Sequence, residues 1–353
     1  MTLAVGLQAS AAALCTEYDV ALLDLDGVVY VGSAAVPAAP SALEQARDRG
    51  MRLAFVTNNA ARPPAVVAAH LTELGIPAGA GDVITSAQAA AHYLADLLPP
   101  GARVLVIGTV GLVEALHDRG LQAVHTADDQ PAAVVQGYSP DLDWRLLAEG
   151  AIAIRRGLPW VATNLDPTVP SPRGALPGNG SLVAALRLAT GLEPIAATGK
   201  PDPTMHRETV ERTGARRPLI VGDRLDTDIE GAVRAGCQSL LVLSGVTSPR
   251  DLLAAGPHER PTYLGYDVGA LLESHRGPSA GPDGMSCGGW HVSADLTLSA
   301  PGPDPDRGAV RDDLDALRAL CAAAWHASSG STQPSPRAAD EWAAALLARF
   351  ELG

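Results

Sequence analysis

The chain has 353 residues, which is too long for one ordinary domain, so we expect more than one hydrophobic core. Hydrophobic residues make up 47% of it, which excludes a largely disordered chain. The formal net charge of -13 argues against nonspecific binding to nucleic acid or to an anionic membrane surface, because phosphate groups would be repelled. No apolar run approaches the roughly 20 residues of a membrane-spanning helix.

The first 15 residues are small and apolar, as in a signal peptide, but no Lys or Arg precedes Arg47, so the positively charged start of such a peptide is missing. The cysteines are far apart and show no C-x-x-C or Cys/His spacing of a zinc or redox site. They are Cys15, Cys237, Cys287 and Cys321. We therefore expect a reduced, cytoplasmic protein without bound zinc.

Short apolar runs alternate with helical patterns at both ends of the first 275 residues. The expected strands are residues 20–23, 52–56, 218–221 and 239–243, and the expected helices are residues 43–49, 66–74 and 229–235. Apolar strands separated by helices are typical of a sheet that is buried on both faces. The pattern therefore predicts an α/β fold with a doubly wound parallel sheet.

Roughly a hundred residues with strands and helices of their own separate these two blocks. We expect an inserted α/β cap domain at residues 86–181, with the core built from residues 1–85 and 182–275. Residues 276–353 are expected to form a Gly/Pro/Ser linker and a small strand-helix-helix extension. Its single strand is predicted from the strict apolar/polar alternation over residues 290–299. So thin a core should pack on the main body or on a partner.

Two carboxylates, Asp24 and Asp26, follow the first buried strand. Strand alternation places both on one face, and ligands of open parallel sheets bind beyond the carboxyl ends of the strands. The alternative is an ordinary turn, since Asp-Gly is a common turn pair. A ligand site is favoured over a turn because polar residues also follow other strands.

One such group is Thr57-Asn58-Asn59, which leads into a helix, where free backbone N–H groups suit a phosphate. Lys200, in Thr-Gly-Lys-Pro, is the single lysine among 26 basic residues and offers a compact positive charge. Asp223, in Gly-Asp-Arg-Leu-Asp-Thr-Asp, adds an oxygen ligand of the kind that Mg²⁺ prefers. These residues together predict a phosphate and metal site.

The ordered motifs D-L-D-G-V, T-N-N, G-K-P and G-D-R-L-x-T-D resemble those of the haloacid dehalogenase (HAD) superfamily of phosphotransferases. The large insertion between the second and third motifs resembles the NagD-like or 4-nitrophenylphosphatase branch. Over the full length, tail included, the chain is similar to the glycerol-3-phosphate phosphatases of mycobacteria. The resemblance implies a Mg²⁺-dependent phosphomonoesterase that acts on a small phosphorylated metabolite through a phospho-aspartate intermediate. It implies glycerol 3-phosphate as the substrate, with phosphoglycolate or another small phosphate ester as the alternative.

The resemblance also implies roles for single residues. Asp24 would be the nucleophile and Asp26 the general acid and base, and Lys200 would bind both the phosphate and Asp24. The remaining implied roles are phosphate binding by Thr57, Asn58 and Asn59, and Mg²⁺ binding by Asp24, the main-chain carbonyl of Asp26, and Asp223, with Asp228 beside the metal site. For Asp228, two roles stay open, a place beside the metal site and a helix cap.

Several alternatives remain. A dehalogenase of the same superfamily would not need Asp26 or Asp223, whereas a Mg²⁺-dependent phospho-accepting binding module would use a similar site without turnover. Asn164 and Asp166 either face the substrate or brace a loop. The tail could be a fragment of an acetyltransferase-like fold, but it has no R-x-x-G-x-G phosphate loop, so we expect no acyl transfer. We expect neither a nucleic-acid nor a membrane partner, and a homo-oligomer is left open.

Overall fold

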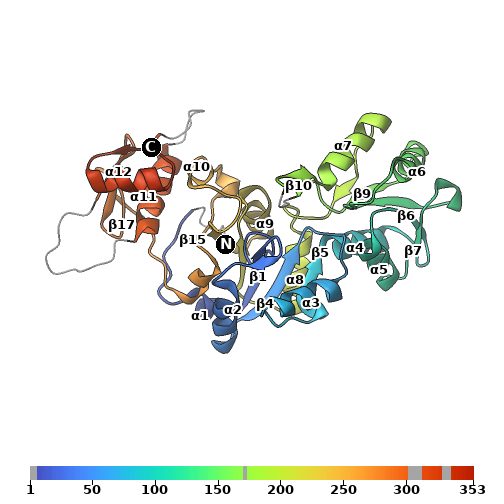
Figure 1. Cartoon of the computed structure of the whole chain (residues 1–353), viewed down its shortest axis with the longest axis horizontal. Coiled ribbons are helices and arrows are strands. Elements are labelled where there is room, and N and C mark those ends of the chain that lie inside the picture. Colours follow the sequence, from blue (N-terminus) through green and yellow to red (C-terminus); the bar gives the residue numbers. More distant parts are fainter. Residues whose placement is uncertain (1–5, 170–172, 301–311, 328–334) are drawn as a thin grey trace. The chain divides into compact units, whose positions relative to one another are not determined.

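The computed structural model describes residues 6–169, 173–300, 312–327 and 335–353 (Figure 1). The chain divides into two compact units. The first comprises Met1–Val31, Ala35–Leu53 and Ala215–Gly353, and the second comprises Gly32–Ala34 and Ala54–Gly214. Among the described residues, no helix combines the length and the apolar character needed to cross a membrane. The domain boundaries expected from the sequence stay a prediction.

In the described part of the first unit, four parallel strands lie in the order β15-β14-β13-β1. They are β1 (Val20–Leu23), β13 (Pro218–Gly222), β14 (Gln238–Val242) and β15 (Tyr263–Gly265). Nearly every residue in them is buried, as the continuous apolar runs predicted. The expected parallel α/β architecture is therefore confirmed.

The helices of this core include the expected ones with small shifts at their ends. They are α1 (Leu14–Glu17), α2 (Ala39–Asp48), α9 (Glu230–Ala235) and α10 (Pro249–Leu253). A π-helical turn, η3 (Leu225–Ile229), precedes α9. The chain after β1 also contains the short strands β2 (Tyr30–Val31) and β3 (Ala34–Ala35).

The second unit begins with the parallel pair β4 (Arg52–Thr57) and β5 (Val83–Thr85), between which lies α3 (Pro64–Glu73). Its described strands also form a five-stranded parallel sheet in the order β12-β9-β8-β6-β7. These strands are β6 (Arg103–Ile107), β7 (Gln122–Val124), β8 (Ala133–Gln136), β9 (Trp160–Ala162) and β12 (Ala196–Ala197). The expected strands of the insertion are thus present.

The five-stranded sheet is covered on both faces, and the alternation along β6 shows how. Val104 and Val106 belong to the hydrophobic cluster beneath α4 (Ser86–Leu97) and α5 (Val110–Asp118). Leu105 and Ile107 belong to the opposite cluster, beneath α6 (Trp144–Arg155) and α7 (Asn179–Thr190). Successive residues of a strand point to opposite faces, so one apolar run supplies both cores.

Elements after residue 181 also belong to the five-stranded sheet and its hydrophobic cluster. Helix α7 buries Val183 and Leu186 in the same cluster as Trp160, and β12 pairs with β9. Helix α8 (Thr204–Thr213) and the antiparallel pair β10 (Thr168–Val169) and β11 (Leu176–Pro177) complete the second unit. The Gly178-Asn-Gly-Ser segment opens α7.

The tail contradicts the expected strand-helix-helix extension, because its described strands form a five-stranded sheet in the order β16-β17-β18-β19-β20. These are β16 (Ser279–Gly281), β17 (Gly284–Cys287), β18 (Trp290–Ser293), β19 (Thr297–Ser299) and β20 (Arg337–Ala338). The stretch predicted to be a linker thus contains two strands. The alternating residues predicted to be one strand form a hairpin, with Leu296 at a positive φ of 63° in its turn.

The two helices expected in the tail are present, as α11 (Asp313–Ala327) and α12 (Glu341–Arg349) (Figure 1). Tail residues such as Trp290 and Leu317 share one hydrophobic cluster with Leu252 and Leu264 of the sheet core. The expectation that so thin a domain packs on the main body is therefore confirmed. The tail is a continuation of the first unit's core.

Candidate active site

Three carboxylates meet at the carboxyl ends of two neighbouring strands. Asp24, Asp223 and Asp228 each offer an oxygen atom, and these atoms lie within 4.8 Å of one another. Asp24 directly follows β1 and Asp223 directly follows β13, and Asp24 N donates to Val221 O at 2.8 Å. The parallel register therefore brings together two aspartates that are about 200 residues apart in the chain.

Asp223 is 1% exposed and is held by the loop that follows β14. Val246 N donates to Asp223 Oδ2 at 2.7 Å, and Thr247 N donates to Asp223 O at 3.1 Å. Two glycines make room for the carboxylate. A Cβ on Gly245 or on Gly27 would come within 2.5 Å or 2.6 Å of Asp223 Cγ, respectively. Both positions therefore require the absence of a side chain, a signal that the sequence analysis did not use.

Asp228 is also 1% exposed and lies within the turn η3. Its Oδ2 accepts a hydrogen bond from Arg224 N at 3.2 Å, and a Cβ on Gly222 would come within 2.5 Å of the same oxygen. Asp228 thus lies in the acidic cluster and bonds the start of the turn from within it, and its place beside a metal ion stays a prediction. Asp226, by contrast, is exposed and pairs with Arg224.

Asp26 is half-buried, two residues after Asp24, in the tight loop that follows β1. Gly27, which has φ +85°, closes this loop by donating from its N atom to Tyr30 O at 2.8 Å. Ser244 Oγ donates to Gly27 O at 2.6 Å and joins the loop to the one that holds Asp223. The roles of Asp26 as general acid and as a main-chain metal ligand stay predictions.

The donor set of the acidic cluster fits Mg²⁺. Mg²⁺ takes oxygen ligands, usually one or two carboxylates supplemented by water and substrate phosphate oxygens. The cluster offers carboxylate oxygens from three residues, and the glycines at 27, 222 and 245 keep two of those residues closely packed. Two of these carboxylates are buried, and a bound cation would offset the repulsion within the group.

The second unit brings the T-N-N and G-K-P motifs together. Lys200 N donates to Asn58 Oδ1 at 2.8 Å, and Asn58 Nδ2 donates to Lys200 O at 3.1 Å. The Lys200 side chain is 4% exposed, and its Nζ donates to Val56 O at 3.1 Å. The lysine side chain is thus held against the strand that ends at Thr57.

Asn58 is braced from the inserted region. Its main-chain carbonyl accepts from Asn164 Nδ2 at 2.7 Å and from Ser86 Oγ at 2.6 Å, and its Nδ2 donates to Asp166 Oδ2 at 3.0 Å. Asp166 N in turn donates to Asn164 Oδ1 at 3.2 Å. Asn164 and Asp166 therefore brace a loop, one of the two alternatives. The sequence analysis missed Ser86, whose only signal was its place at a helix start.

Thr57 is buried, and its Oγ1 accepts a hydrogen bond from Asn59 N at 3.1 Å. The Asn59 side chain is exposed, and its Oδ1 accepts from Ala61 N at 2.8 Å, so it stabilises the turn toward α3. Phosphate binding by Thr57, Asn58 and Asn59 stays a prediction.

Comparison with known proteins decides the family. A family model described as haloacid dehalogenase-like hydrolase matches residues 21–122, and a second HAD-hydrolase-like model matches residues 197–271. The D-glycerol 3-phosphate phosphatase of Mycobacterium tuberculosis is 46% identical to the chain over 345 residues, which is 96% of either protein. The chain belongs to the HAD-like hydrolases.

Solved structures agree with this assignment. The glycerol phosphate phosphatase of Mycobacterium tuberculosis in complex with magnesium superposes with a TM-score of 0.84 at 44% identity, covering 98% of this chain and 100% of that one. A 4-nitrophenylphosphatase of Thermotoga maritima gives a TM-score of 0.68 at 29% identity, covering 73% and 98%. The predicted branch of this HAD hydrolase and its phosphatase class are thereby confirmed. The magnesium bound in the Mycobacterium tuberculosis structure agrees with the donor set of the acidic cluster.

The tail of this HAD hydrolase has a relationship of its own. A model described as a GCN5-related N-acetyltransferase like domain matches residues 287–352. This agrees with the acetyltransferase-like alternative for the fold of the tail. The expectation that the tail carries out no acyl transfer stays a prediction.

Proposed function

We propose that the chain is a Mg²⁺-dependent phosphatase that hydrolyses glycerol 3-phosphate. The carboxylate cluster of Asp24, Asp223 and Asp228 carries the proposal, because a phosphatase of this kind needs a nucleophile and a cation site in one place. The choice of substrate is supported by the name of the Mycobacterium tuberculosis relative, which matches the tail as well as the core.

In the proposed reaction, an Asp24 carboxylate oxygen attacks the phosphorus atom, and the bond from phosphorus to the glycerol oxygen breaks. Asp26 gives its proton to the leaving alkoxide, so glycerol departs neutral. Asp26 then takes a proton from a water molecule as that water attacks the phosphorus of phospho-Asp24. Inorganic phosphate leaves, and Asp24 returns to its carboxylate form.

The attack requires that a carboxylate approach an anionic phosphate. Mg²⁺ held by Asp24, Asp223 and the Asp26 carbonyl, with Asp228 beside it, would supply positive charge that offsets this repulsion. Thr57, Asn58, Asn59 and Lys200 would bind the phosphate oxygens and orient them for attack. The proposal requires both sets of residues to act on the same phosphate group during turnover.

The test is phosphate release from glycerol 3-phosphate and from phosphoglycolate, with and without Mg²⁺. Wild-type protein should turn over many times only with Mg²⁺, and Asp24→Asn should be inactive. Asp226→Asn is the matched control, because Asp226 is an exposed aspartate near the same site. Turnover without a divalent metal, or a near-normal rate for Asp24→Asn, would contradict the mechanism. A single phosphorylation event without release would favour a phospho-accepting binding module.

We also propose a reducing, cytoplasmic location. All four cysteines fall within the described residues and form no disulfide there, and Cys15, Cys287 and Cys321 are buried. Cysteines that form no disulfide suit a compartment that keeps them reduced. The proposal includes a possible homo-oligomer, and light scattering coupled to gel filtration measures the oligomeric state.

A further inference from the structure

The tail shares its hydrophobic core with elements that carry the metal carboxylates. Leu225 and Ile229, at the two ends of the turn η3, flank Asp228 and belong to the same cluster as the tail residues Leu320 and Trp325. Tail side chains therefore pack in the hydrophobic cluster that borders the turn carrying Asp228.

A second path runs through the loop that holds Asp223. This loop includes Val246 and Thr247, whose N–H groups bond Asp223, and it leads directly into α10. Ser248 caps α10 in a capping box with Asp251, which fixes the direction in which the loop enters the helix. Helix α10 then packs against α11 of the tail, beside it in Figure 1.

One side chain joins the two helices. Trp325 of α11 is 8% exposed, and its Nε1 donates to Leu252 O of α10 at 3.1 Å. The guanidinium carbon of Arg260 lies 5.2 Å from the centre of the Trp325 ring, which adds a cation–π contact that holds the ring in place. Leu252 O also accepts from Ala255 N at 3.1 Å, so the indole is an additional donor and the one that comes from the tail.

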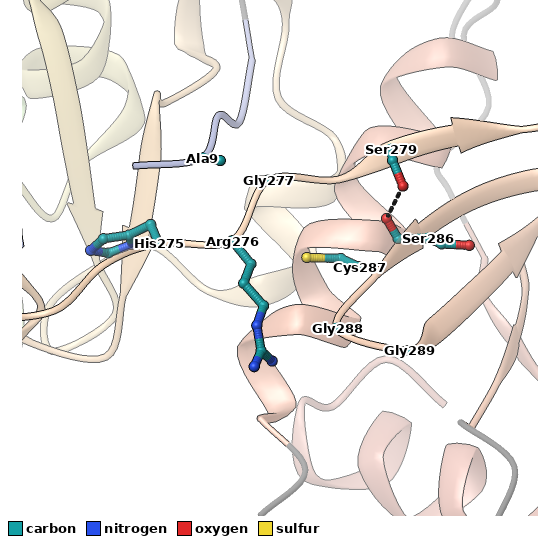
Figure 2. Close-up of a pocket in the computed structure, with 9 residues that line it drawn as sticks. All are labelled: Ala9, His275, Arg276, Gly277, Ser279, Ser286, Cys287, Gly288 and Gly289. Atoms are coloured by element: carbon teal, nitrogen blue, oxygen red, sulfur yellow. Dashed lines mark hydrogen bonds between the residues drawn. The ribbon is translucent and has the colours of Figure 1, made fainter. Parts of the chain in front are cut away.

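A shift of the tail to compensate for loss of the Trp325 hydrogen bond is hindered, because a buried ion pair holds the tail near the point where it leaves the core. Asp315 of α11 is fully buried and accepts from Arg276 Nη1 at 2.6 Å and from Arg318 Nη1 at 2.8 Å. Arg318 Nη2 also donates to Leu264 O of β15 at 2.8 Å. Figure 2 shows Arg276 on the segment that links the core to the tail, beside a hollow of about 410 Å³. Breaking such a buried ion network is costly.

We propose that Trp325 is a positioning residue for the metal site, which holds α10 and thereby the Asp223 loop in the geometry that binds Mg²⁺. The inference rests on the proposed function, since it takes the acidic cluster to be the Mg²⁺ site. It assigns the tail a part in metal affinity. Gly245 packs closely against Asp223, so a small displacement of the loop changes the position of the carboxylate.

The test uses Trp325→Phe in the full chain, which keeps an aromatic ring and removes the hydrogen-bond donor. Calorimetric titration of the metal-free protein with Mg²⁺ should show binding weakened by about 2- to 30-fold, the range for substitutions along a coupled network. The activity should require correspondingly more Mg²⁺, whereas kcat at saturating Mg²⁺ should return toward the wild-type value.

Trp290→Phe is the matched control. Trp290 is a buried tail tryptophan in the same cluster, and its Nε1 has no hydrogen-bond partner among the described residues. It should bind Mg²⁺ as the wild type does. A Trp325→Phe protein that melts at a lower temperature but keeps wild-type Mg²⁺ affinity would overturn the inference, as would equal weakening by both variants.

Two further outcomes are distinguishable. Failure of the wild type to bind Mg²⁺ would refute the proposed function itself, whatever the variants do. Where Trp325→Phe does not fold, Arg250→Gln replaces it, because Arg250 is exposed on α10 and its Nη2 donates to Glu351 O of the tail at 2.6 Å. This variant should weaken Mg²⁺ binding by about twofold or more, and unchanged binding would count against the inference.

Discussion

Asn58 and Lys200, which are 142 residues apart, are joined by two hydrogen bonds of opposite direction. Lys200 N donates to Asn58 Oδ1, and Asn58 Nδ2 donates to Lys200 O. The amide side chain of Asn58 thus bonds both main-chain groups of Lys200, as a neighbouring β-strand would. The conformation of the chain at Lys200 therefore depends on Asn58.

Replacing Asn58 with alanine should lower both stability and activity. The loss leaves Lys200 N and Lys200 O without these partners, at a cost of about 1–3 kcal/mol each if they stay buried. We expect a lower melting temperature and a reduced kcat/KM for glycerol 3-phosphate. Gln45→Ala, which removes an exposed amide on α2, should change neither. A normal kcat/KM for Asn58→Ala would show that Lys200 does not need this support.

Replacing Asp26 with asparagine should slow the reaction in a manner that depends on the leaving group. Removing a general acid typically costs about 10²- to 10⁴-fold for a leaving alkoxide such as that of glycerol. A nitrophenolate departs without protonation, so 4-nitrophenyl phosphate should lose less. Steady-state rates on the two substrates measure the difference. Equal losses of kcat/KM on both would argue against proton donation from Asp26 to the leaving alkoxide.

Adding a methyl group at Gly245 should weaken Mg²⁺ binding. The new Cβ would overlap Asp223, and overpacking of this kind costs about 1–3 kcal/mol. We expect the Kd for Mg²⁺, titrated into the metal-free protein, to be at least about fivefold higher for Gly245→Ala. Gly81→Ala is the control, because a Cβ there meets nothing within 4 Å. Unchanged Mg²⁺ affinity in Gly245→Ala would mean that the loop can shift to accommodate the added methyl group.

The stability of the protein should fall in mild acid because of His206. This side chain on α8 is 1% exposed, and neither ring nitrogen has a hydrogen-bond partner among the described residues. Burial, assisted by the positive charge of Lys200, lowers the pKa of His206 from 6.5 to about 3. The unfolded chain therefore takes up a proton below pH 6.5 that the folded protein rejects until about pH 3.

The contribution of His206 to stability is present above pH 6.5 and is lost as the pH falls from there toward 3. At about 1.4 kcal/mol per pH unit, the loss reaches about 2 kcal/mol by pH 5. Urea unfolding at pH 7 and pH 5 should show a smaller difference for His206→Leu than for the wild type. The exposed His125, replaced in the same way, should leave the difference unchanged. An identical pH dependence in His206→Leu would show that the ring does not resist protonation.

The alternation over residues 290–299 shows how a correct local pattern can yield a wrong element. Val292 and Leu298 face each other across the β18–β19 hairpin and are both fully buried. They are an even number of residues apart, so the apolar/polar parity continues through the turn as it would along one strand. Only the reversal at Leu296, which no apolar pattern encodes, separates the two possibilities.

Local periodicity and the polar residues at strand ends were enough to predict the parallel sheet and the meeting of Asp24 with Asp223, because neighbouring parallel strands end at one edge. Tertiary structure alone decided that Ser86, Asn164 and Asp166 brace Asn58, and that Trp325 bonds Leu252. These contacts join segments whose separation in the chain carries no periodic signal. They form only where the packing of whole elements brings one donor within about 3 Å of one acceptor.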